Sequence, residues 1–300
     1  MTLALAEAAA EALVRVEVAR RELFLAPLRS RMARVAGVHF DNQKTVLERK
    51  LRERGAHLNE SVCREGLGDA VAGLMITIFD EFAVDTADAM REILMMAMEG
   101  AIKHRLLDFG YAMSFSLRNP AAQRYLKTYC LNEIKKIDAT TLKIMKGIVY
   151  QGLYEGASYT EIAARMVSRY AAFGTPVPQH HLRNRAELIA TYETATAYEA
   201  AGREVADTIA KKGIPIEKSS ITVGDDRVDA ECLAKEAQKW IPLDQPFTTH
   251  LQKDNVEHQR SPFHIACRCT TIYRVATKRA REMLARSPNP APVEFYAIIK

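Results

Sequence analysis

The sequence predicts a mainly α-helical protein with a small α+β module near its C-terminal end. Ala, Leu, Glu and Arg, which are good helix formers, dominate the first residues of the chain. Apolar side chains between residues 61 and 109 recur at the i, i+3, i+4 spacing of a helix. After residue 214 the pattern changes to β-rich segments separated by loops, so the sheet is expected only there.

Residues 1–137 are predicted as an N-terminal helical region that opens with two helices. The first covers 3–35, and Pro27 is expected to kink or break it because proline lacks a backbone N–H. The second covers 42–54 and ends at Gly55, a residue type that commonly terminates helices.

The remainder of this N-terminal region is also helical in pattern. The apolar stripe of 61–109 predicts long helix there, with a break or restart at Asp85 because Asp favours helix N-caps. Pro120 suits the first position of a further helix, which is predicted to extend to about Ile137.

Residues 138–275 are predicted as a second domain, whose helices fill 140–211. Ser158 and Glu161 have the spacing of a capping box, in which each side chain bonds the backbone N–H of the other, so a helix should begin there. A long helix is predicted over 182–211, and the glycine and proline that follow should end it.

The domain closes with an α+β module at 214–275. Alternating and β-branched residues predict strands at 216–223 and 269–275, with a short helix near 228–238 between them. The last segment, 276–300, is predicted as a basic helix followed by an extended, proline-containing tail.

Charge is distributed unevenly along the chain, whose formal net charge is +5. Residues 1–55 hold 11 basic and 7 acidic side chains, and residues 252–286 hold 8 and 3, whereas 56–251 hold 22 and 26. Basic segments attract polyanions through counterion release. Solvated helix faces explain the same charges, since no run of five basic residues occurs.

No apolar segment reaches the roughly 18 residues that a membrane span needs. The most apolar run, Val71–Phe79, is about half that length, and the N-terminal segment lacks the basic start of a signal peptide. The chain is therefore expected in a reducing cytoplasm without a membrane partner. In that setting its five cysteines are expected to be thiols or metal ligands rather than disulfides.

A cluster of metal-ligand residue types marks the C-terminal module: Asp229, Cys232, His264, Cys267 and Cys269. The D-x-x-C and H-x-x-C pairs have knuckle-like spacing, and thiolate and imidazole suit zinc, with carboxylate oxygen as a further ligand. A module of this size has a small core that a metal would stabilise. The alternative is a set of buried thiols beside a hydrogen-bonded histidine.

Catalytic chemistry has little support in the sequence. A Cys/His nucleophile pair at Cys267 lacks an accompanying glycine motif for an oxyanion hole, and no P-loop, Rossmann fingerprint, HExxH or GxSxG occurs. Asp226 is expected near the N-cap of the short helix rather than as a metal ligand, with Arg227 paired to a carboxylate. The chain is therefore expected not to be an enzyme.

Five segments occur in an order that is more specific than any one of them. They are Arg185–Thr194 (RAELIATYET), Thr222–Val228 (TVGDDRV), Asp229–Cys232 (DAEC), Pro242–Phe247 (PLDQPF) and Pro262–Cys269 (PFHIACRC). This ordered set resembles the phage head morphogenesis family, whose namesake is the F protein of phage Mu. The resemblance covers about residues 140–275, and residues Arg185, Glu193, Asp226, Arg227 and Arg268 are its structural motif positions.

The chain departs from the family pattern at four positions within these segments. Thr191 stands where the family has Arg, Tyr192 where it has Thr, Asp229 where one branch has Cys, and Ile265 where it has Pro. The resemblance therefore implies the fold of the module, whereas the missing thiolate at position 229 leaves the metal site open.

The resemblance implies a phage minor head protein with a structural role in head assembly, genome packaging or DNA delivery. Such proteins lie inside the capsid near the portal vertex in a few copies, after assembly in the host cytoplasm. The implied partners are the portal protein, the major capsid or scaffolding protein and packaged double-stranded DNA. The alternative is a nucleic-acid-binding protein with a zinc knuckle, and an enzyme attached to such a module ranks last.

Overall fold

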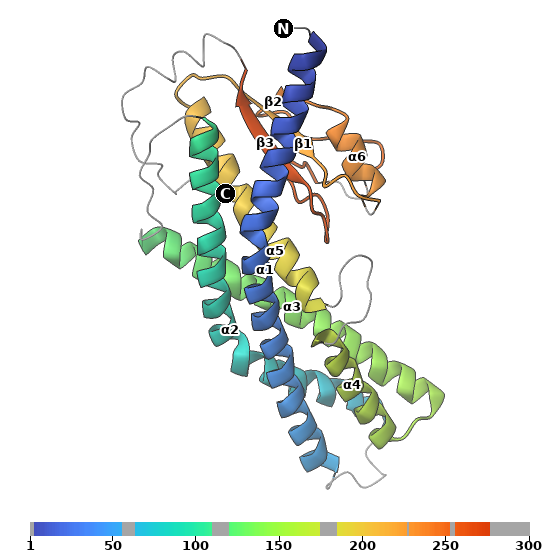
Figure 1. Cartoon of the computed structure of the whole chain (residues 1–300). Helices are drawn as coiled ribbons and strands as arrows, with labels where there is room; N and C mark the ends of the chain where they lie inside the picture. The colour runs from blue at the N-terminus through green and yellow to red at the C-terminus, as the bar shows by residue number, and fades with distance from the viewer. Residues whose placement is uncertain are drawn as a thin grey trace. The chain divides into compact units, whose positions relative to one another are not determined.

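The structure is a computed structural model that describes residues 3–55, 64–109, 120–174, 185–226, 228–252 and 256–276. Six helices and a three-stranded antiparallel sheet are found in these residues (Figure 1). This confirms the predicted mainly α fold with a small α+β module near the C-terminal end. The predicted basic helix and tail after residue 276 lie outside the described residues.

The elements follow one another as α1 (Leu3–Gly55), α2 (Arg64–Asp108), α3 (Pro120–Glu155), α4 (Tyr159–Gly174), α5 (Arg185–Ala210), β1 (Ile216–Ile221), α6 (Ala230–Glu236), β2 (Ile241–Pro242) and β3 (Thr270–Val275). The strand order in the sheet is β2-β1-β3, so the central strand is the first in sequence. Strand β1 pairs with β3 over its whole length, from Ile216 opposite Val275 to Ile221 opposite Thr270.

The described residues form two compact units, each assembled from separated stretches of chain. The first unit takes its residues from 1–31, 93–123 and 190–300, and the second from 32–92 and 124–189. The sequence-based boundary at residue 137 falls inside helix α3.

The second unit is a helical bundle with an apolar core. Sixteen buried residues from α1, α2, α3, α4 and the start of α5 form this core, among them Phe40, Leu47, Met145 and Tyr170. Helix α3 ends at Gly156, whose φ of 74° suits glycine, and the Ser158 hydroxyl then accepts the N–H of Glu161 at 3.3 Å. The Glu161 carboxylate accepts the N–H of Ser158 at 2.7 Å, which confirms the predicted capping box.

Three helices are longer than the sequence predicted. Helix α1 continues through Pro27 and through residues 36–41, α2 continues through Asp85, and α3 continues through residues 138–139. The predicted breaks at these places were wrong. Proline costs α1 one backbone hydrogen bond, but Leu25 and Leu28 on either side of it are buried, and this burial keeps the segment helical.

One buried hydrogen-bond network explains why the helices continue through residues 36–41, Asp85 and residues 138–139. The His39 ring contacts the hydroxyl of Thr86 through Nδ1 at 2.9 Å and the carboxylate of Asp138 through Nε2 at 3.0 Å. Gln43 donates to Asp138 at 2.8 Å and accepts from the Tyr170 hydroxyl at 3.1 Å. The side chains of Thr86 and Asp138 therefore form hydrogen bonds to another helix and do not cap a helix end.

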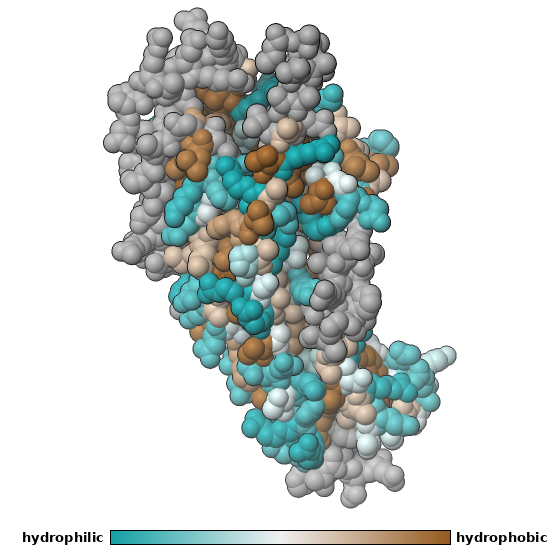
Figure 2. All heavy atoms as spheres, viewed as in Figure 1, coloured by the Kyte–Doolittle hydropathy of each residue, from teal (hydrophilic) through white to brown (hydrophobic). Residues whose placement is uncertain are grey.

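No helix in the described part of the chain is long and apolar enough to cross a membrane. On the face drawn in Figure 2, hydrophilic and hydrophobic residues are interspersed.

Candidate metal centre

Cys232 is positioned by α6, a helix of seven residues that begins after Asp229. The Asp229 carboxylate accepts the backbone N–H of Glu231 at 2.8 Å, which satisfies a free donor of the first turn. Helical periodicity turns Cys232 and Lys235 to the buried side of the helix. The Lys235 ammonium donates to the Glu231 carboxylate at 2.6 Å and lies 4.4 Å above the ring of Phe263.

His264 and Cys267 are positioned by the turn that precedes β3. The backbone N–H of Cys267 donates to the carbonyl of His264 at 3.1 Å and closes the turn. Ala266 has a φ of 67°, a left-handed conformation that side chains disfavour and that here lets the chain reverse within four residues. Cys269 follows immediately before the first residue of β3.

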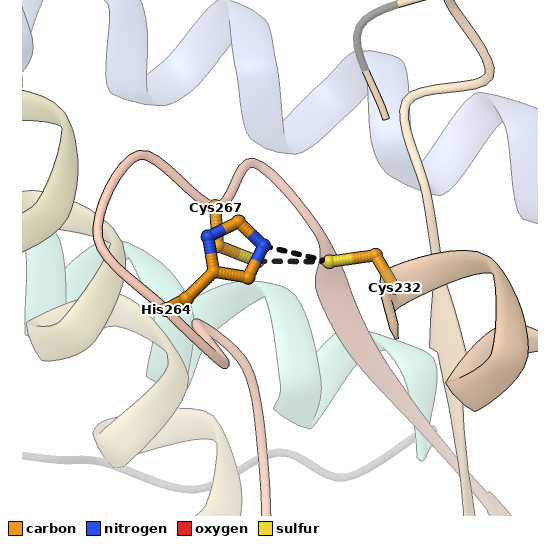
Figure 3. A group of neighbouring side chains, drawn as sticks. All are labelled: Cys232, His264 and Cys267. Atoms are coloured by element: carbon orange, nitrogen blue, oxygen red, sulfur yellow. Dashed lines mark hydrogen bonds between the residues drawn. The ribbon is translucent and has the colours of Figure 1, made fainter. Parts of the chain in front are cut away.

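Three ligand atoms converge on one point between this turn and α6. The Sγ of Cys232 lies 3.1 Å from Nε2 of His264 and 3.8 Å from Sγ of Cys267 (Figure 3). All three atoms lie within 4.8 Å of one another. Cys232 and Cys267 are buried and His264 is half-buried, so the histidine is the most accessible of the three residues.

The hydrogen bonding of His264 fixes which ring nitrogen is free. Nδ1 lies 2.8 Å from the carbonyl oxygen of Ile265. Because a carbonyl only accepts, Nδ1 carries the proton of the neutral imidazole and Nε2 keeps its lone pair. That lone pair faces Cys232, where it accepts a thiol proton or binds a metal ion, and the bond to Ile265 holds the ring in this orientation.

The thiols of Cys232, Cys267 and Cys269 have unequal proton affinities. Hydrogen bonds to the Cys267 sulfur from Cys232 and from Cys269 hold the pKa of Cys267 well below its usual range. The interaction with Cys267 in turn raises the pKa of Cys232, and the interactions with Cys232 and Cys267 raise the pKa of Cys269. One thiolate is thus stabilised in the cluster, and the thiolate is the form that binds metals.

Cys269 interacts with the thiols of Cys232 and Cys267, whereas the ligand atoms that lie within 4.8 Å of one another are those of Cys232, His264 and Cys267. Together the three cysteines make up half of one buried cluster of the module, which consists of Cys232, Ile241, Phe247, Phe263, Cys267 and Cys269. Such a core is small, and a bond network through its sulfur atoms would contribute a large share of its stability.

The separation of the two sulfur atoms in this group is one that a shared metal ion could span. Zinc–sulfur bonds of about 2.3 Å at tetrahedral angles place two sulfur atoms about 3.8 Å apart. The observed separation of the Cys232 and Cys267 sulfur atoms is 3.8 Å. The Nε2 atom of His264 completes the group of three ligand atoms, which could hold a metal ion.

Asp229, the fifth residue of the predicted cluster, has a different role. Its carboxylate caps α6, and it lies outside the group of ligand atoms formed by Cys232, His264 and Cys267. Asp226, which was expected in a turn near the N-cap, occupies an exposed turn three residues before the N-cap residue Asp229. Arg268 pairs with Asp225 at 2.7 Å and so ties the cysteine turn to that same turn, whereas Arg227 lies outside the described residues.

The other two motif residues, Arg185 and Glu193, lie in different units. In the second unit, the Arg185 guanidinium donates to the Thr141 hydroxyl and to the Ile137 carbonyl, each at 2.8 Å. Burial lowers the pKa of Arg185 to about 10, and its guanidinium stacks 4.8 Å from the ring of Phe173. Glu193 is buried in the first unit.

Sequence reasoning missed a group of buried charges beside β3. Arg105 of α2 donates to the Thr271 carbonyl at 2.8 Å and pairs with Glu17 at 2.7 Å. Glu199 of α5 accepts the Thr271 N–H at 3.2 Å and pairs with Arg21 at 2.9 Å. These side chains complete the hydrogen bonding of the strand on the edge that faces away from β1. No sequence motif distinguishes them from the exposed charges of the same helices.

Comparison with protein-family models gives one match. Residues 143–272 match the model described as Phage Mu protein F like protein. This confirms the resemblance predicted from the ordered motifs and supports a phage head-related protein, which implies association with the virion. Comparison with curated proteins and with solved structures found no match.

Proposed function

We propose that the chain is a phage minor head protein that lies inside the capsid near the portal vertex and has a structural, non-enzymatic role. The observation that carries this proposal is the family match over residues 143–272, inside which the motif segments occur in the family order. The expected partners are the portal protein and the major capsid or scaffolding protein, and the process is head assembly, genome packaging or DNA delivery.

The structural roles of the motif residues support a binding scaffold rather than a catalyst. The Asp229–Cys232 segment caps and builds α6, and the Pro262–Cys269 segment forms the turn that leads into β3. The three sulfur atoms belong to residues that are at most 3% exposed. A nucleophile needs access to its substrate, so this burial favours a structural role for the thiols.

The test is the position of the chain in assembled particles of the phage that encodes it. We expect mass spectrometry of purified virions to detect the chain in a few copies, and cryo-electron microscopy to show its density near the portal. Deletion of its gene should leave portal and capsid proteins expressed but reduce the yield of DNA-filled heads. Purified, infectious virions without the chain would refute the proposal.

We further propose that the metal of this centre is zinc, held by Cys232, His264, Cys267 and Cys269. The 3.8 Å sulfur separation, the free Nε2 of His264 and the stabilised thiolate of Cys267 support this assignment. Zinc would stabilise the small module by linking α6 to the turn before β3. Asp229 stays outside the ligand set because its carboxylate is engaged as the helix cap.

Metal analysis of the purified protein tests the zinc assignment. We expect about one equivalent of zinc in the wild type and loss of most of it in Cys232→Ser, because removal of one thiolate opens the tetrahedral shell. Cys130→Ser is the matched control, since Cys130 is also buried but lies in the second unit. Cobalt substitution should give the thiolate-to-metal absorption of a tetrahedral site, and wild-type protein without bound metal would contradict the assignment.

A further inference from the structure

Helix α3 has an exposed face that combines lysines with tyrosines. Twenty residues of this helix contribute six long side chains to one side: Lys135, Lys136, Lys143, Lys146, Tyr150 and Tyr154. At about 100° of rotation per residue, all six fall within about 100° of the helix circumference. At 1.5 Å per residue the face extends over about 29 Å.

The side chains of this face are available to a partner. Tyr154 is 94% exposed, Tyr150 is 59% exposed and the Lys136 side chain is 71% exposed. Within the described residues, Lys143 and Lys146 form no ion pair. Two aromatic rings left in water on one side of a helix are a feature of binding surfaces rather than of solvated faces.

The carboxylates of the same stretch do not neutralise this face. Asp138 is buried and bonded to His39, and Glu155 points to Arg165 of α4. Glu133 forms an ion pair with Lys136 at 2.6 Å, so one acidic side chain of α3 does touch the face. The face therefore keeps a clear positive balance.

A basic groove continues the surface toward α4. It has a volume of about 500 Å³ and is lined by Gln151 of α3 and by Arg165, Ser168 and Arg169 of α4, with apolar side chains at its base. Arg165 pairs with Glu155, while Arg169 lies 5.7 Å above the ring of Phe173. The groove adds planar hydrogen-bond donors on the α4 side of Gln151.

We propose that this surface of α3 and α4 binds the phosphate backbone of double-stranded DNA. Lysine is depleted in protein–protein interfaces, but lysine, arginine and tyrosine all donate to phosphate oxygens. Duplex DNA carries one negative charge per about 1.7 Å, so a basic face of about 29 Å can meet several phosphates at once. The identity of the polyanion rests on the proposed function, because a head protein inside a capsid meets packaged duplex DNA.

Fluorescence anisotropy with a labelled 30-base-pair duplex of mixed sequence, titrated at several salt concentrations, tests this surface. We expect salt-dependent binding by the wild type. Lys143→Gln/Lys146→Gln should weaken it about tenfold and reduce the slope of log Kobs against log salt by about two, since each lost phosphate contact lowers the slope by about one. Lys103→Gln/Lys211→Gln is the matched control, because it removes two exposed lysines from the first unit and should leave both quantities unchanged.

A variant of the two tyrosines gives a second, independent test of the surface. Tyr150→Ala/Tyr154→Ala keeps every charge and should weaken duplex binding about threefold with an unchanged salt slope. Equal binding by wild type and both surface variants would overturn the proposal, and so would a preference of tenfold or more for single strands or binding only to acidic proteins. Because the assay uses purified protein, its failure leaves the location of the chain in virions unaffected, and the two proposals fail separately.

Discussion

The C-terminal module and the helical bundle of the second unit are stabilised by different kinds of interaction. The bundle buries sixteen apolar residues in a single core. One core cluster of the module holds six buried residues, of which three are cysteines, and charged side chains of α1, α2 and α5 are buried beside β3. Burial of apolar area scales with size, so a small module needs specific bonds where a bundle can rely on packing. The stability of the module should therefore depend more on individual metal–ligand bonds and ion pairs, and the stability of the bundle more on apolar packing.

Removal of the metal should give the largest difference between the two regions. Structural zinc contributes about 10 kcal/mol or more to the folding of small domains. We expect a strong chelator to abolish hydrogen-exchange protection in peptides from α6 and β3, while peptides from Met145 to Tyr170 keep theirs. Equal loss in both regions would contradict the contrast, and re-addition of zinc should restore the protection.

Removal of a buried charge should come next. Arg105→Ala leaves the Thr271 carbonyl without its buried donor and removes one of the two arginines paired with Glu17, so we expect the free energy of unfolding to fall by about 3–5 kcal/mol. Chemical denaturation measures the change. Lys103→Ala, two residues earlier on the exposed side of α2, is the control and should change it by less than about 0.5 kcal/mol.

Truncation of the bundle core should cost somewhat less. Met145 is fully buried, and Met145→Ala removes its contacts and leaves a cavity, so we expect a loss of about 3 kcal/mol with no change in bound metal. The measurement is denaturation combined with metal analysis. Loss of zinc in this variant would show that the bundle and the metal centre are not independent.

The smallest effect should come from the cap of α6. Asp229→Ala removes the hydrogen bond to the Glu231 N–H and should cost about 1 kcal/mol, whereas Asp229→Asn keeps a good cap and should be nearly neutral. Neither variant should release metal if Asp229 is only a cap. Asp226→Ala, in the exposed turn, is the control for both and should be within about 0.5 kcal/mol of the wild type.

Local signals in the sequence determined much of the fold. The fold class, the capping box at Ser158, the end of α5 before Gly213 and the two main strands follow from residue types within a few positions of each element. The ordered motifs also identified the family segment, which the match over 143–272 confirms. These features depend on neighbours in sequence, and neighbours in sequence are visible without a structure.

Tertiary contacts decided where the long helices continue. The sequence predicted helix ends near residues 36–41 and after Ile137, and a break at Asp85 because Asp favours N-caps. In the structure, His39, Thr86 and Asp138 bond to one another across three helices. A buried network of this kind outweighs local capping preference, and its partners are 47 and 99 residues apart, so no local pattern reveals them.

The candidate metal centre depends on both the sequence and the tertiary structure. Residue types and spacing alone indicated Cys232, His264, Cys267 and Cys269 as candidates, together with Asp229. The tertiary structure brought α6 against the turn before β3, which placed two sulfur atoms and one ring nitrogen together and assigned Asp229 to the helix cap. Sequence supplies the donor atoms, but the bond lengths of a metal fix their positions in space, and only the folded chain decides which donors reach those positions.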